Sequence, residues 1–132
     1  MKYFVSTHNI TSNYLDVSSG ITDILGYNKD DLIGTFAYDR IHREDITKVS
    51  QSHINSVDGD ANQVVYRILS KSGKYVWIRA TSTTITNSIQ YGNKESVENA
   101  VVVVFNQKMK WIEIVYYKLT KALKYGKYDK FH

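Results

Sequence analysis

Three potential metal ligands lie close together at His42, Glu44 and Asp45. Zinc and similar ions are bound by imidazole nitrogens and carboxylate oxygens, so this group is the first candidate for metal chemistry. Its spacing coincides with the start of a predicted helix, where the helix dipole favours acidic side chains. We therefore interpret these residues as helix-start residues and predict no metal site.

The second candidate is His53, in the middle of the same predicted helix. A partly buried imidazole can donate to a ligand, coordinate haem iron, or hydrogen-bond to a neighbouring tyrosine or serine. One histidine alone does not indicate a haem site, so we favour the hydrogen bond to a tyrosine or serine. We predict that no cofactor is required; haem and noncovalently bound flavin are the alternatives, and an absorption spectrum tests both.

Covalent chemistry is restricted by composition, because the sequence contains no cysteine. This excludes disulfides, thiolate metal sites, cysteine nucleophiles and light-driven flavin adducts on cysteine. The sequence also lacks a GxSxG motif, an HExxH motif and a glycine-rich phosphate loop, and no pair of carboxylates has a usable spacing. We therefore predict noncovalent recognition and no enzyme activity.

The chain has 132 residues, of which 42% are apolar, enough for one hydrophobic core but too few for two domains. Its net charge of +4 comes from the C-terminal stretch, where Glu113 and Asp129 face a larger set of lysines: Lys110, Lys118, Lys121, Lys124, Lys127 and Lys130. These lysines could contact nucleic-acid phosphates, but such a stretch is more typical of a solvated or partner-contacting helix, so we expect no direct nucleic-acid binding. With no run of eighteen apolar residues and no secretory signal, we expect a soluble, intracellular chain that contacts no membrane.

The first third of the sequence predicts a β-hairpin followed by two short helices. Residues 4–8 and 13–17 are β-prone runs separated by a polar segment. A helix capped by Ser18 or Ser19 should end at Gly26. A second helix should begin after Asn28, with Asp31 favouring its amino end, and should end at Gly34.

The remaining sequence predicts a longer helix, three strands and a terminal helix. Apolar residues at helical spacing indicate a helix over 43–57 that ends at Asp58-Gly59-Asp60. β-branched and aromatic residues then indicate strands over 63–69, 75–85 and 97–106, with a turn at 71–74 and a longer loop at 87–96. The last segment, 109–125, predicts an amphipathic helix whose apolar stripe is formed by Trp111, Val115, Leu119 and Ala122 or Leu123. This order indicates an α+β fold, with a five-stranded antiparallel sheet covered by helices on one face.

Three motifs in this order resemble the PAS superfamily. Residues 26–34 resemble its G-Y-x-x-x-[DE]-L-[IL]-G segment, and residues 42–45 resemble its H-P-E-D helix start, with Arg43 in place of proline. Residues 66–78 resemble its [YF]-R-[LMI]-x-x-K-x-G-x-[YF]-x-W-[LIV] hairpin. The resemblance implies a PAS domain over 1–107, followed by a basic amphipathic helix and tail over 108–132.

A narrower resemblance is to the second PAS repeat, PAS-B, of basic-helix-loop-helix transcription factors of the aryl-hydrocarbon-receptor and hypoxia-inducible-factor classes. It rests on the opening at residues 4–8, on Ser52-His53 and on Phe105-Asn106. It implies a nuclear or cytoplasmic-nuclear domain that contacts another PAS protein, as heterodimer or homodimer, and transcriptional coregulators. The alternative is a sensory PAS domain of a signalling kinase or a fungal regulator.

The resemblance also implies an internal cavity between sheet and helices that accepts a small, largely apolar molecule. The alternative is an ordinary core whose polar groups satisfy one another. The implied lining is His8, Tyr14, Ala37, Ile41, Val49, Ser52, His53, Tyr66, Ile68, Ile78, Ala80, Ser82, Val104 and Asn106.

Strand alternation places Trp77 and Arg79 on the opposite face of the sheet. In the PAS superfamily this face contacts other PAS domains, so the resemblance implies a partner interface, with Trp111 of the terminal helix as a further candidate. The alternative is that the terminal helix folds back and covers this face with Trp111, Val115 and Leu119. A helix that alternates between the two arrangements would regulate partner binding.

Overall fold

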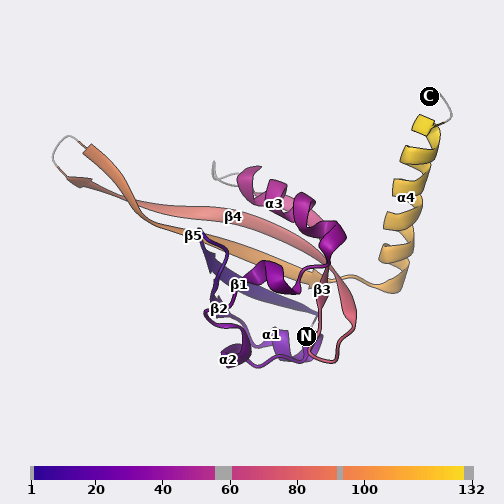
Figure 1. The fold of residues 1–132 in the computed structure, drawn as a ribbon, viewed down its shortest axis with the longest axis horizontal. Helices are drawn as coiled ribbons and strands as arrows, with labels where there is room; N and C mark the ends of the chain where they lie inside the picture. The colour runs from indigo at the N-terminus through magenta and orange to yellow at the C-terminus, as the bar shows by residue number, and fades with distance from the viewer. Residues whose placement is uncertain (1, 56–60, 92–93, 130–132) are drawn as a thin grey trace.

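A five-stranded antiparallel sheet forms the body of the computed structural model, which describes residues 2–55, 61–91 and 94–129 (Figure 1). Its spatial order is β2-β1-β5-β4-β3, so β1 and β5 pair at the centre, from Tyr3↔Gln107 to Asn9↔Val101. The predicted antiparallel sheet is confirmed. The strands are β1 (Tyr3–Asn9), β2 (Tyr14–Val17), β3 (Asn62–Leu69), β4 (Tyr75–Tyr91) and β5 (Lys94–Lys108).

Helices cover one face of this sheet and enclose the core with it, as predicted. Alternate side chains are buried on this inner face, as the period of two in a strand requires: Phe4, Ser6 and His8 in β1, Ile78, Ala80 and Ser82 in β4, and Val104 and Asn106 in β5. The covering elements are α1 (Gly20–Leu25), α2 (Lys29–Leu32), the 3₁₀ turns η1 (Ala37–Arg40) and η2 (Arg43–Asp45), and α3 (Ile46–Asn55). The core combines strand and helix residues, among them Phe4, Ile21, Leu25, Leu32, Val49, Ile68, Ile78 and Val104.

The ends of α1 and α2 follow from local sequence. Gly26 ends α1 with a φ of 81°, in the left-handed region that glycine adopts at little cost. A capping box begins α2, where the amide of Asn28 donates to Asp31 Oδ2 over 2.9 Å. Ser19 occupies the N-cap position of α1, but its side chain makes no capping hydrogen bond. Ser18 does not cap the helix either, because its Oγ accepts from the amide of Val5 over 2.7 Å.

The long helix starts differently from the prediction. Residues 43–45 form the 3₁₀ turn η2, and the α-helix begins only at Ile46. The buried Asp45 accepts hydrogen bonds from the backbone amide and the guanidinium of Arg67 at 2.8–2.9 Å, which joins the helix start to β3. Asp45 therefore contacts a strand, a role that helix-dipole reasoning did not include. The predicted stop at 58–60 lies outside the described residues.

β4 and β5 continue well beyond the rest of the sheet. The sequence predicts a loop over 87–96, but β4 runs to Tyr91 and β5 starts at Lys94, with a register shift between Asn87 and Ser88. Their tip projects far from the helices in Figure 1. The loop prediction is wrong because it read polar residues as turn residues, whereas pairing between two long strands holds this segment extended.

The terminal helix α4 (Trp111–Asp129) stands at the end of the molecule opposite the β4–β5 tip (Figure 1). The buried Met109 precedes it, and its amide donates to Trp77 O over 3.1 Å, which fixes where the chain leaves the sheet. No helix among the described residues has the length and hydropathy needed to cross a bilayer.

Candidate functional site

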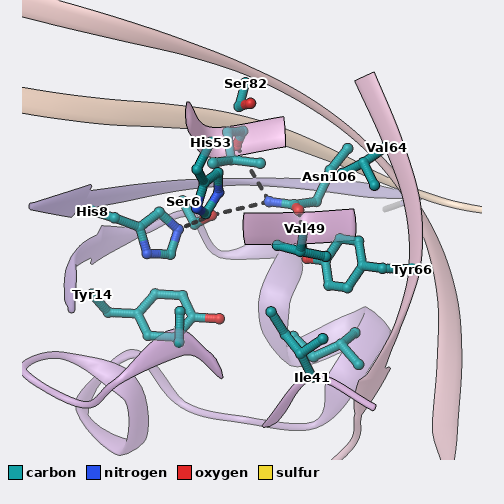
Figure 2. A pocket seen from close by; sticks show the side chains of 14 residues that line it. Ser6, His8, Tyr14, Ile41, Val49, His53, Val64, Tyr66, Ser82 and Asn106 are labelled. Carbon is teal, nitrogen blue, oxygen red and sulfur yellow. Dashed lines mark hydrogen bonds between the residues drawn. The ribbon is translucent and has the colours of Figure 1, made fainter. Parts of the chain in front are cut away.

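An enclosed cavity of about 30 Å³ lies between the inner face of the sheet and the helices (Figure 2). All the residues predicted to line a cavity border it, except Ser52 and Ile78, which are buried but are not part of its lining. Sequence reasoning missed Ser6 and Val64. Alternation could have found Ser6, because it lies between the inward-facing Phe4 and His8. The full lining is Ser6, His8, Tyr14, Ala37, Ile41, Val49, His53, Val64, Tyr66, Ile68, Ala80, Ser82, Val104 and Asn106.

A chain of hydrogen bonds crosses one wall of the cavity (Figure 2). The Tyr66 hydroxyl donates to Asn106 Oδ1 over 3.0 Å, and Asn106 Nδ2 donates to Ser6 Oγ over 3.0 Å. Ser6 Oγ lies 2.8 Å from His8 Nε2. The Ser6 hydrogen finds an acceptor if Nε2 of His8 is unprotonated, which places the imidazole hydrogen on Nδ1. This chain joins β1, β3 and β5 across the sheet.

Two buried polar atoms remain unsatisfied, and one of them belongs to the cavity lining. His8 Nδ1 and Ser52 Oγ are buried and have no hydrogen-bond partner among the described residues. Since a buried polar group normally has a partner, His8 Nδ1, whose residue lines the cavity, can offer a hydrogen bond to a guest there, whereas Ser52 does not line the cavity.

Burial keeps the titratable groups of the cavity uncharged near neutral pH. It lowers the pKa of His8 to about 4, and the charge of His53 acts in the same direction to a smaller extent. Burial raises the pKa of Tyr14 to about 12 and raises that of Tyr66 further. The cavity therefore presents neutral donors and acceptors rather than charge.

His53 hydrogen-bonds to a tyrosine, as predicted. Its Nδ1 lies 2.8 Å from the hydroxyl of Tyr38 in η1, and the two rings stack with centroids 5.8 Å apart. Burial lowers the pKa of His53. At the first candidate, the group of His42, Glu44 and Asp45, His42 Nδ1 accepts from the amide of Glu44. No cluster of three or more potential metal ligands occurs among the described residues.

The outer face of the sheet carries the predicted interface residues Trp77 and Arg79, and α4 contacts both. Arg79 forms an ion pair with Glu113 over 2.8 Å, and the Trp77 ring lies 5.8 Å from that of Tyr117. The helix touches this face at Trp77 and Arg79 but does not cover it, so the predicted cover by Trp111, Val115 and Leu119 is wrong. Trp111, Val115 and Leu119 point away from the sheet and are exposed.

The centre of the outer face is not covered by these contacts. Tyr3 and Phe105 lie side by side there, with ring centroids 5.2 Å apart, and both are more than one third exposed, as is Ile85 of β4. Sequence reasoning did not select these residues, although alternation from the inward-facing Phe4 and Asn106 places Tyr3 and Phe105 outward.

Comparison with known proteins assigns this arrangement. A family profile described as the PAS fold matches residues 14–91, from the start of β2 to the end of β4. The chain belongs to the PAS-fold family. The PAS-B domain of Drosophila melanogaster Cycle superposes with a TM-score of 0.65 at 19% identity, covering 80% of this chain and 99% of that one. At this identity the likeness shows the fold.

Curated relatives place this PAS domain in a narrower group. Hypoxia-inducible factor 1-alpha of Oncorhynchus mykiss is 31% identical over 78% of this chain and 13% of its own length. Neuronal PAS domain-containing protein 3 of Mus musculus is 27% identical over 71% of this chain and 10% of its own length. The resemblance to basic-helix-loop-helix PAS proteins is thereby confirmed. The chain spans only about an eighth of the length of the first of these relatives.

Proposed function

We propose that this PAS domain is a noncovalent interaction module of a transcription regulator, and that it pairs with another PAS domain through the outer face of its sheet. Transcriptional coregulators and a nuclear or cytoplasmic-nuclear location belong to the same proposal. The relatives named above favour it over a sensory kinase or fungal regulator.

The exposed apolar side chains at the centre of the sheet carry this proposal. Tyr3, Phe105 and Ile85 belong to β1, β5 and β4, the three central strands, so a partner that covers them contacts a broad surface. Apolar groups clustered on one face mark an interaction site, and aromatic residues are enriched at the centres of such sites. The inner face is already occupied by helices, which leaves the outer face for a partner.

Phe105→Glu tests this surface. Ile33→Glu is its matched control, because both side chains are 37% exposed but Ile33 follows α2, away from the sheet face. Sedimentation velocity measures association of the chain with itself and with the Drosophila Cycle PAS-B domain. We expect Phe105→Glu to weaken association at least about tenfold, as loss of a central aromatic contact does, while Ile33→Glu leaves it unchanged.

Two outcomes contradict the proposal. The first is that Phe105→Glu and Ile33→Glu weaken association equally. The second is that the wild-type chain associates neither with itself nor with the Cycle PAS-B domain. Circular dichroism of both variants establishes that each is folded before association is compared.

The cavity adds a proposed sensory role, for which a small hydrogen-bonding molecule is the best-supported ligand. A volume of about 30 Å³ holds about two water molecules, at roughly 10–15 Å³ each, and is far below the several hundred Å³ of sites for drug-sized ligands. A largely apolar ligand would first require the side chains to move apart. The wild-type Cycle PAS-B structure contains bound ethylene glycol, a small molecule with two hydroxyl groups.

Titration of the ¹⁵N-labelled chain with ethylene glycol tests the cavity, with benzene as the apolar comparison. We expect ethylene glycol to shift the amide resonances of β1 around His8, and Ser82→Val, which fills part of the cavity, to remove the effect. Equal shifts in the wild-type chain and in Ser82→Val would refute binding inside. An absorption spectrum of the purified chain tests the haem and flavin alternatives.

A further inference from the structure

The apolar side of α4 is turned away from the sheet. A helix with an apolar stripe normally buries that stripe against the protein. In α4 the contacts to the sheet come instead from Glu113, Tyr117 and Lys118. The exposed apolar residues of α4 are Trp111, Ile112, Val115, Tyr116, Leu119 and Leu123, and at 100° per residue Val115 and Leu119 lie nearly opposite Tyr117.

A groove of about 330 Å³ runs between α4 and the outer face of the sheet, and its charge is positive. Lys118 Nζ lies 5.5 Å above the Trp77 ring, and Lys121 Nζ lies 5.9 Å above the Tyr117 ring. The guanidinium of Arg67, also at the groove, is paired with acidic residues of η2. Neither Lys118 nor Lys121 forms an ion pair within the described part of the chain. The groove is lined by Arg67, Trp77, Tyr117, Lys118, Lys121 and Ala122.

The groove and the apolar stripe form one continuous surface. Lys118 and Ala122 line the groove together with Tyr117 and Lys121 of the same helix. At 100° per residue, Lys118 and Ala122 project between those two residues and the side of α4 that carries Val115 and Leu119. A partner lying along the stripe therefore has the Lys118 ammonium group at its edge. This surface therefore combines apolar side chains with positive charge.

From this combination we infer that α4 docks an acidic amphipathic helix of another protein. The apolar residues of that helix would cover the stripe centred on Val115 and Leu119, and its aspartates or glutamates would pair with Lys118 at the edge of the stripe. This goes beyond PAS pairing through the sheet, because the docking surface is on the terminal helix.

Charge favours this occupant over two others. A second copy of α4 would bring its own lysines against these, and like charges at a helix interface oppose association. An anionic membrane would attract the lysines, but their ammonium groups lie over rings at the groove between α4 and the sheet, which the side chain of a docked helix can enter and a flat lipid surface cannot.

A designed peptide serves as the probe. It is a fluorescein-labelled helix of about 18 residues, with leucines at i, i+3, i+4 and i+7 and glutamates at its other exposed positions. The comparison peptide has lysine in place of every glutamate. Fluorescence anisotropy measures the affinity of each peptide for the full chain, and we expect only the acidic peptide to bind.

Variants separate specific docking from general attraction. Lys118→Glu should lower affinity about fivefold, the upper range for one exposed ion pair, and Leu119→Ala should lower it about tenfold. Lys74→Glu makes the same charge change at an exposed position on the β3–β4 turn and should stay within about twofold. Phe105→Glu should leave peptide binding unchanged, so failure of the sheet proposal and failure of this one are distinguishable.

Several results would overturn the inference. Equal binding of the acidic and basic peptides would remove the charge argument, and equal losses in Lys118→Glu and Lys74→Glu would remove the site. Dimerisation of the chain that Leu119→Ala abolishes would assign the stripe to a second copy. Binding to phosphatidylserine vesicles that depends on Leu119, without peptide binding, would assign it to a membrane surface.

Discussion

Acidification should destabilise this PAS domain through one buried histidine, His8. Its pKa is lowered from 6.5 to about 4, chiefly by burial and to a smaller extent by the charge of His53. The unfolded chain then binds more protons than the folded chain between these two values, so stability is full above pH 6.5 and falls as the pH drops toward 4. The full shift corresponds to about 3 kcal/mol, of which about 1.4 kcal/mol is lost by pH 5.5.

Urea denaturation at pH 7.5 and at pH 5.5 measures this loss. We expect the unfolding free energy of the wild-type chain to fall by at least about 1.4 kcal/mol between these two values, because protonation of His53, whose pKa burial also lowers, adds to the effect of His8. In His8→Gln the decrease should be smaller by about 1.4 kcal/mol.

The result that refutes this reasoning is a His8→Gln variant whose stability falls with acid as steeply as that of the wild type. It would show that His8 is no harder to protonate in the folded chain than in the unfolded one. A lower stability of His8→Gln at both pH values is not such a result, because the variant also alters the contact with Ser6 Oγ.

Three other perturbations have defined outcomes. Asp45→Asn should lower the unfolding free energy by about 3 kcal/mol in urea denaturation, because Arg67 loses its buried charged partner. Glu44→Gln changes an exposed side chain and should lower the unfolding free energy by less than about 0.5 kcal/mol. Stability should also fall in strong acid. Burial raises the pKa of Asp45, but the hydrogen bonds from Arg67 outweigh this effect and hold the pKa below its usual value. The stabilisation is therefore lost as the pH falls through that lowered pKa, and Asp45→Asn should flatten this loss. Trp77→Ala should speed amide hydrogen exchange in α4 while exchange in β1 stays slow, and equal exchange in α4 of the variant and the wild type would contradict the contact with Tyr117.

Much of the inner face was predictable because a strand alternates strictly. Once residues 66–78 were recognised as a hairpin, Tyr66, Ile68, Ile78 and Ala80 had to face the same side. Alternation does not give the volume that remains between such side chains. That volume depends on how deeply α3 and η1 pack, which is why buried residues such as Ser52 and Ile78 were assigned to the cavity although neither borders it.

Long-range pairing explains the elements that the sequence did not predict. The 87–96 segment is polar, and its residue types resemble those of loops. Its extended form depends on pairing with residues up to twelve positions away, such as Asn87↔Asn99. Asp45 is a similar case, since its partner Arg67 lies 22 positions along the chain and local helix rules contain no information about it.

The orientation of α4 shows most clearly what local sequence cannot determine. The spacing of Trp111, Val115 and Leu119 correctly indicates an amphipathic helix, and burial of that stripe would be favoured by about 1.5–3 kcal/mol for each large side chain. An exposed ion pair such as Arg79–Glu113 contributes no more than about 1 kcal/mol, so this pair alone cannot hold the stripe outward. The direction in which the stripe faces is set where the chain leaves the sheet. The buried Met109 fixes the exit from β5, and Glu113 Oε1 accepts from the amide of Lys110 at the start of the helix. A stripe held outward by the chain's own exit is available to another protein without any rearrangement of the sheet.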